Sequence, residues 1–137
     1  AEKVSAAGGI GSQPERGTAM FGTTAKIAEY LSAVKELRGQ LAEPDLPDRK
    51  KVKAVERCLE RVLKPMQDAM LLGELSLDLS DAQLQTASAA ALAIKGHIVE
   101  LTDATNKGVF DVVNRELVEI QEAAETYLSI ATIGESL

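Results

Sequence analysis

The chain has 137 residues, which is enough for one domain that buries roughly two thirds of its unfolded surface. It carries 15 basic and 21 acidic residues, a formal net charge of −6, and this excess of acid argues against a general nucleic-acid-binding protein. No run of eighteen apolar residues occurs, so we expect no segment that spans a membrane.

The first 22 residues are predicted to form an extended or disordered arm. They contain five of the ten glycines and one proline, without a sustained hydrophobic period. Four apolar side chains could anchor the arm on a partner, namely Val4, Ile10, Met20 and Phe21. The chain starts at Ala1, as removal of a targeting peptide at a small-residue site would leave it, although a trimmed chain would start in the same way.

The first helix is expected to begin at Thr23 or Thr24, either of which can cap it, and to end near Ala42. Residues 43–47 (EPDLP) then stop it, because two prolines lack the N–H donors and the backbone freedom that a helix needs. Its apolar stripe comprises Ile27, Leu31, Val34, Leu37 and Leu41, widened by Ala28 and Tyr30.

The second helix is expected over residues 48–72, with Asp48 as its cap and Gly73 as its end. Pro65 lies inside this helix, where it removes one backbone hydrogen bond and clashes with the preceding turn. We therefore expect a kink near residues 61–64 or a split into two helical pieces. The apolar stripe comprises Val52, Val55, Leu59, Val62 and Met66.

The third helix is predicted to begin at Asp81, because Ser80 and Gln83 form a capping box that Leu79 and Leu84 flank as a hydrophobic staple. Its stripe comprises Leu84, Ala87, Ala91, Ile94, Ile98 and Leu101, and it ends in a short turn at residues 105–108. The fourth helix is expected to stop at Gly134, and its stripe comprises Phe110, Val113, Leu117, Ile120, Ala124, Tyr127 and Ala131.

Four amphipathic helices with short connections predict an all-α protein. The expected architecture is an up-down-up-down four-helix bundle over residues 23–137, with the extended N-terminal arm at residues 1–22. No run of alternating β-branched and aromatic residues indicates a strand.

The second helix also carries a concentration of positive charge. Seven of the fifteen basic residues fall in residues 48–64, and the rest of the chain has 8 basic against 18 acidic residues, a net charge of −10. Like charges four residues apart each cost a helix about 0.2–0.5 kcal/mol, and a face that served solubility alone would mix the signs. A solvated lysine-rich face remains the other interpretation, because the total cost is only about 1 kcal/mol.

We predict that this face binds an acidic protein surface or anionic lipid headgroups. The predicted partner-binding residues are Lys50, Lys53, Arg57, Arg61 and Lys64. Nucleic acid is disfavoured, because the stretch contains no aromatic side chain on which a base could stack.

The sequence predicts no catalytic, cofactor-binding or metal-binding residues, and hence no enzyme. A metal site needs clustered ligands, and the chain has one His, one Cys and no Glu-x-x-His pair. The glycines near the N-terminus lack the Lys-Ser/Thr of a phosphate-binding loop. Cys58 is expected to be a small packed side chain beside the stripe.

His97 has two interpretations. A single histidine in a four-helix bundle resembles histidine phosphotransfer domains, in which lysine and glycine follow three and four residues later. Here Glu100 and Leu101 occupy those positions, and a carboxylate one turn away would repel an incoming phosphoryl group. We therefore expect a side chain at the boundary between the apolar stripe and solvent.

Residues 65–71 (PMQDAML) and 98–104 (IVELTDA), with Lys107 and the final helix containing Tyr127, resemble the PsbQ-type extrinsic proteins of photosystem II. The chain differs from that family in having Lys64 where a tryptophan often precedes the proline, and its net acidity differs from the basic higher-plant members. The resemblance implies a non-enzymatic subunit in the thylakoid lumen, peripheral on the membrane. It would help the oxygen-evolving centre of photosystem II retain calcium and chloride, without binding an ion itself. The alternative is a helical adaptor of another multiprotein complex.

Overall fold

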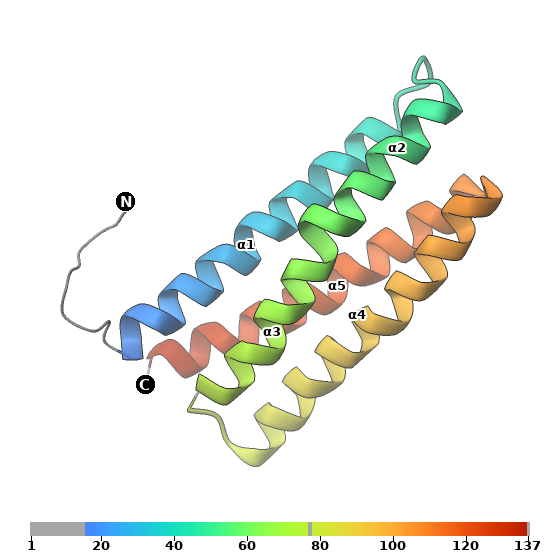
Figure 1. The fold of residues 1–137 in the computed structure, drawn as a ribbon. Helices are drawn as coiled ribbons and strands as arrows, with labels where there is room; N and C mark the ends of the chain where they lie inside the picture. Colours follow the sequence, from blue (N-terminus) through green and yellow to red (C-terminus); the bar gives the residue numbers. More distant parts are fainter. Residues whose placement is uncertain (1–15, 77, 137) are drawn as a thin grey trace.

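The computed structural model describes residues 16–76 and 78–136, and within them the side chains of residues 22–74 and 78–132. These residues form four helical rods (Figure 1). The first rod is α1 (Arg16–Leu41), and the second joins α2 (Asp48–Cys58), the π-helix η1 (Leu59–Leu63) and α3 (Lys64–Ser76). The third and fourth are α4 (Asp81–Lys107) and α5 (Phe110–Ser136). The described residues contain no strand, so the predicted all-α class is confirmed.

The rods form a closed up-down-up-down bundle. Each rod packs against the next along the chain, and α1 also packs against α5, which closes the ring. Figure 1 shows the start of α1 and the end of α5 at the same end of the bundle. The turn between α4 and α5 is short because Gly108 adopts a left-handed conformation, with φ 70°, that caps α4.

The first helix begins earlier than expected. α1 starts at Arg16 rather than at Thr23 or Thr24, so residues 16–22 of the predicted arm are helical. The glycines in this stretch suggested a loop, but each costs a helix only about 1 kcal/mol relative to alanine, which a long helix can absorb. Residues 1–15, including Val4 and Ile10, lie outside the described residues, as do the side chains of Met20 and Phe21.

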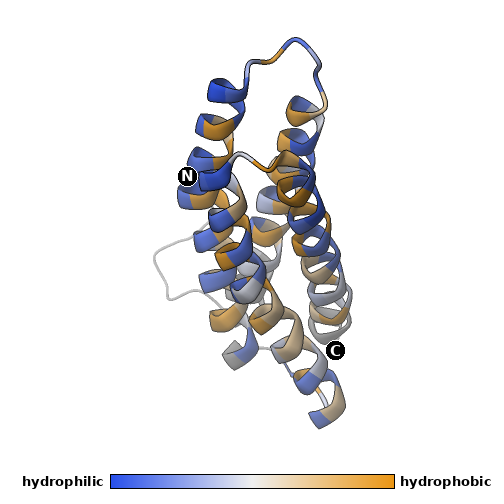
Figure 2. Ribbon diagram, turned by 90° about the vertical axis from the view of Figure 1, so that its right-hand side faces the viewer, coloured by the Kyte–Doolittle hydropathy of each residue, from blue (hydrophilic) through white to orange (hydrophobic). Residues whose placement is uncertain are grey.

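The core follows most of the predicted stripes (Figure 2). Every predicted position of α5 from Val113 to Ala131 is buried, and Phe110 is half-buried. Two predicted positions are exposed, namely Leu84 at the first turn of α4 and Ala28 on α1. The buried apolar side chains of the second rod are Val55, Cys58, Leu59, Leu63, Met66 and Met70.

Pro65 explains the irregular second rod. It has no N–H to donate to the carbonyl four residues earlier, and its ring would collide with that carbonyl in a regular α-helix. The preceding residues form a π-helical turn, in which the Lys64 N–H donates to the Leu59 carbonyl five residues back. The predicted interruption is therefore present, as a wider turn between two α-helical pieces.

The π turn changes which residues face the core. A turn with i to i−5 bonds contains one residue more than an α-turn, which displaces the following residues by about 100° around the axis. Within this turn Leu63 is fully buried, whereas Val62 of the predicted stripe is only half-buried; Met66, beyond the turn, remains buried as predicted. The regular 3-4 alternation was thus wrong at this position.

Helix caps agree with the sequence at α4 and differ at α2. The Ser80 hydroxyl accepts from the Gln83 N–H at 3.2 Å, and the Ser80 N–H donates to Gln83 Oε1 at 2.9 Å, so the capping box is confirmed. At α2 the cap position is Pro47, not Asp48 as predicted, and no side chain forms a capping hydrogen bond there. Asp48 is instead the first residue of the helix. Its carboxylate there complements the positive end of the helix dipole.

Neither predicted glycine stop ends its helix. α5 continues past Gly134 to Ser136, and α3 continues past Gly73 to Ser76. Gly73 is buried against Tyr127, whose hydroxyl donates to the Met70 carbonyl at 2.5 Å. A Cβ atom on Gly73 would lie 2.5 Å from that hydroxyl oxygen. The glycine therefore allows close contact between α3 and α5, and it does not end α3.

Cys58 is buried in α2, and this burial raises the pKa of its thiol from 9.0 to about 12. Because the thiolate is the reactive form, we expect the native protein to resist a thiol-specific chromogenic reagent at pH 8. The same reagent should react promptly once denaturant unfolds the chain. Equal rates in the native and denatured protein would contradict the buried position.

Candidate functional site

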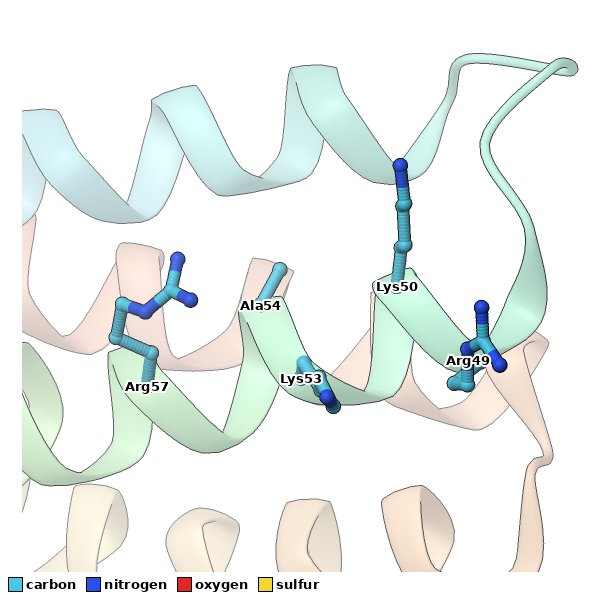
Figure 3. Close-up of a pocket in the computed structure, with 5 residues that line it drawn as sticks. All are labelled: Arg49, Lys50, Lys53, Ala54 and Arg57. Atoms are coloured by element: carbon cyan, nitrogen blue, oxygen red, sulfur yellow. The ribbon is translucent and has the colours of Figure 1, made fainter.

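Four basic side chains gather beside one depression on α2. The depression has a volume of about 420 Å³ and is lined by Arg49, Lys50, Lys53, Ala54 and Arg57. Figure 3 shows Lys50, Ala54 and Arg57 on the side of α2 that faces α1, with Arg49 near the connecting loop. The small side chain of Ala54 leaves the space that the longer basic side chains surround.

This cluster, the basic depression, is electrostatically unbalanced. Among the described residues, no carboxylate lies within 4.0 Å of any of its four cationic groups. Lys53 and Arg57 are exposed and four residues apart, and Arg49 precedes Lys53 by the same interval. Such pairs repel, and cations in the first turns of a helix also oppose its dipole. The arrangement therefore presents a positive potential that an anionic partner would relieve.

Two of the five predicted binding residues lie apart from the basic depression. Lys64 contacts Glu60 at 2.8 Å and lines a separate groove against Thr102 and Asn106 of α4. Arg61 is exposed but does not line the depression. The π turn separates both residues from the depression, because Arg61 lies within the turn and Lys64 follows it, where residues are displaced around the rod axis.

The structure brings Lys50, Lys53 and Arg57 together as expected, and adds Arg49. Its spacing of four residues from Lys53 was the signal that could have identified it. Another basic residue of the stretch, Lys51, is directed elsewhere, with its ammonium 5.4 Å from the centroid of the Phe110 ring.

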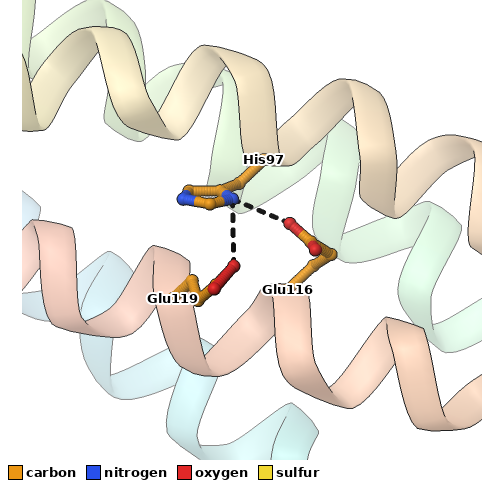
Figure 4. Close-up of side chains that lie close together, drawn as sticks. All are labelled: His97, Glu116 and Glu119. Atoms are coloured by element: carbon orange, nitrogen blue, oxygen red, sulfur yellow. Dashed lines mark hydrogen bonds and ion pairs between the residues drawn. The ribbon is translucent and has the colours of Figure 1, made fainter.

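A second polar cluster lies between α4 and α5 (Figure 4). His97 Nδ1 is 2.7 Å from Glu116 Oε1 and 3.4 Å from Glu119 Oε1. The side chain of His97 is 24% exposed, as expected for a boundary position, but that of Glu116 is only 1% exposed. The two carboxylates belong to a different helix from His97, so the sequence alone did not indicate them as its partners.

Comparison with known proteins gave no match to a protein-family model, to a curated protein or to a solved structure. The fold and the two clusters are therefore interpreted from their own chemistry. Within the described ranges, none of the helices has the combination of length and apolar character needed to cross a bilayer.

Proposed function

We propose that this protein is a non-enzymatic docking subunit that binds an acidic protein surface through the basic depression. The observation that supports this proposal most directly is the group of four cations without an ion-pair partner among the described residues. Their repulsion raises the free energy of the isolated protein, and an acidic partner removes that cost on binding.

The chemistry of the depression favours protein over nucleic acid as the partner. Its lining contains no aromatic side chain, and the chain outside residues 48–64 has a net charge of −10 from 8 basic and 18 acidic residues. The acidic surface outside residues 48–64 would repel an extended phosphate backbone. A small acidic patch on a protein can contact the basic depression without approaching that acidic surface.

We further propose that the partner is the lumenal face of photosystem II. This rests on the resemblance of residues 65–71 and 98–104 to PsbQ-type extrinsic proteins. The first of these segments begins at Pro65, the proline that follows the π turn. In this role the protein would sit peripherally on the thylakoid membrane and shield the oxygen-evolving centre, which helps it retain calcium and chloride.

Rebinding to photosystem II membranes from which extrinsic proteins have been washed tests the proposal. The wild-type chain is expected to sediment with these membranes at low salt and to be released at high salt. A variant with Lys50, Lys53 and Arg57 changed to glutamine should bind roughly 10- to 100-fold more weakly, since each exposed charge contact contributes about 0.5–1 kcal/mol. Binding isotherms at several salt concentrations provide the measurement.

The matched control changes three exposed lysines elsewhere, Lys26, Lys95 and Lys107, to glutamine. It alters the net charge equally and should leave affinity within about twofold of wild type if the position of the charges matters. Equal weakening of both variants would refute the docking face. Failure of the wild-type chain to bind would refute photosystem II as the partner and leave the adaptor alternative.

A further inference from the structure

Three groups that commonly ligate metals converge between α4 and α5. The ligand atoms of His97, Glu116 and Glu119 all lie within 4.8 Å of one another. Figure 4 shows both carboxylates directed at the same ring nitrogen, Nδ1, with the imidazole of His97 extending from α4 toward α5. Glu116 and Glu119 are three residues apart on α5, which places them on one face of that helix.

The cluster of His97, Glu116 and Glu119 has more negative than positive charge. Glu116 is 1% exposed, and a carboxylate buried to that extent requires a compensating charge or several hydrogen bonds. Among the described residues, its one hydrogen-bond partner is His97, and the nearest additional cation is the exposed Arg115, whose Nε is 3.7 Å from Glu116 Oε2. Glu119 adds a second negative charge at the same nitrogen. Even a protonated imidazole would leave the three groups with a net charge of −1.

We propose that His97, Glu116 and Glu119 bind one divalent transition-metal ion of the zinc class. Zinc binds imidazole nitrogen and carboxylate oxygen at about 2.0–2.2 Å, so two ligand atoms at a tetrahedral angle on one ion stand roughly 3.3–3.6 Å apart. The separation of 3.4 Å between Nδ1 and Glu119 matches this spacing, whereas the 2.7 Å between Nδ1 and Glu116 is a hydrogen-bond distance that would lengthen by about 0.6 Å when an ion enters. Two carboxylates and a neutral imidazole also balance a charge of +2.

The ligand set identifies the class of ion. Imidazole nitrogen favours zinc and the neighbouring transition metals, whereas calcium and magnesium prefer sites made of oxygen alone. Binding forms a metal bond to the Nδ1 lone pair, and any proton on Nδ1 is released to solvent. The proton of the neutral ring then resides on Nε2.

The site is open to solvent on one side. The side chains of His97 and Glu119 are 24% and 41% exposed, so one side of the cluster is open to solvent while Glu116 closes the other. Three protein ligands with one solvent position is a common arrangement for zinc. Because the ligands come from two helices, the ion would link α4 to α5 and stabilise their packing.

Zinc titration of the metal-free, full-length protein in the absence of any partner tests this proposal. At free zinc about 100-fold above the dissociation constant, the melting temperature is expected to rise by roughly 10 °C. Calcium at the same concentration should produce no such shift. The chain has one histidine, so the imidazole resonances in an NMR spectrum report directly on this site and should shift with one equivalent of zinc.

Replacement of one ligand provides the decisive comparison. Glu119→Gln and His97→Gln should each weaken zinc binding by at least about tenfold, whereas Glu122→Gln, an exposed change one turn away, should not. Zinc binding that is equally tight in all three variants would place the ion elsewhere and overturn the proposal. Absence of both the thermal shift and the imidazole shift in wild-type protein would overturn it as well. Neither result bears on docking, which is measured separately with photosystem II membranes.

Discussion

Replacing Leu63 with alanine is expected to lower the free energy of unfolding by about 2–5 kcal/mol. Leu63 is fully buried at the end of the π turn, so truncation removes apolar contacts and leaves a cavity that the surrounding helices fill incompletely. Chemical denaturation followed by circular dichroism at 222 nm measures the change. The slope of the transition should stay constant, because the substitution leaves the fold unchanged.

Val62→Ala is the matched comparison for Leu63→Ala. An uninterrupted 3-4 alternation assigns position 62 to the core, whereas the π turn leaves Val62 half-buried beside the fully buried Leu63. We therefore expect Val62→Ala to cost about 1 kcal/mol or less. If Val62→Ala proved the more destabilising of the two, the shift of register at η1 would be wrong.

The second large effect is expected at Gly73, where alanine should destabilise the protein by about 1–2 kcal/mol. Alanine normally stabilises a helix relative to glycine by about 1 kcal/mol, so a loss would reverse the usual sign. The cause is the 2.5 Å approach of the new Cβ to the hydroxyl oxygen of Tyr127. That hydroxyl cannot withdraw easily, because the ring is buried and the hydroxyl donates to the Met70 carbonyl.

Three further substitutions, followed by thermal unfolding, test whether the contact between Gly73 and Tyr127 is the cause. Gly39→Ala and Gly96→Ala lie in α1 and α4 with nothing within 4 Å of the added Cβ, so each should stabilise by about 0.5–1 kcal/mol. Tyr127→Phe removes the hydroxyl, and alanine at position 73 should then be less destabilising than in the wild-type background. A stabilising Gly73→Ala in the presence of Tyr127 would contradict the described packing.

Local signals predicted the helices whose hydrogen bonding is regular. The capping box at Ser80 fixed the start of α4, and the α5 stripe was correct because one uninterrupted period governs that helix. The sequence also showed that Pro65 would interrupt the second helix. It could not specify the form of the interruption, because a kink, a break and a π turn all relieve the same clash.

The sequence predicted much of the basic depression but not the cluster around His97. Lys50, Lys53 and Arg57 share one helix upstream of the π turn, so their spacing alone placed them together. Lys64 lies beyond that turn, and its position depends on backbone hydrogen bonds that composition does not encode. The approach of Glu116 to His97 depends on how far α4 and α5 are shifted relative to each other along their axes. Packing across the whole helix pair sets that shift.

The π turn also limits the length of the basic surface that the proposed partner would contact. Because the row of cations beside the depression ends at Arg57, it spans residues 49–57, which is about 12 Å of helix at 1.5 Å per residue. A complementary acidic patch on the partner need be only two helical turns long. In the proposed complex, contacts of that extent would cover only a small part of a stable interface, so they would contribute mainly to the rate and orientation of the encounter.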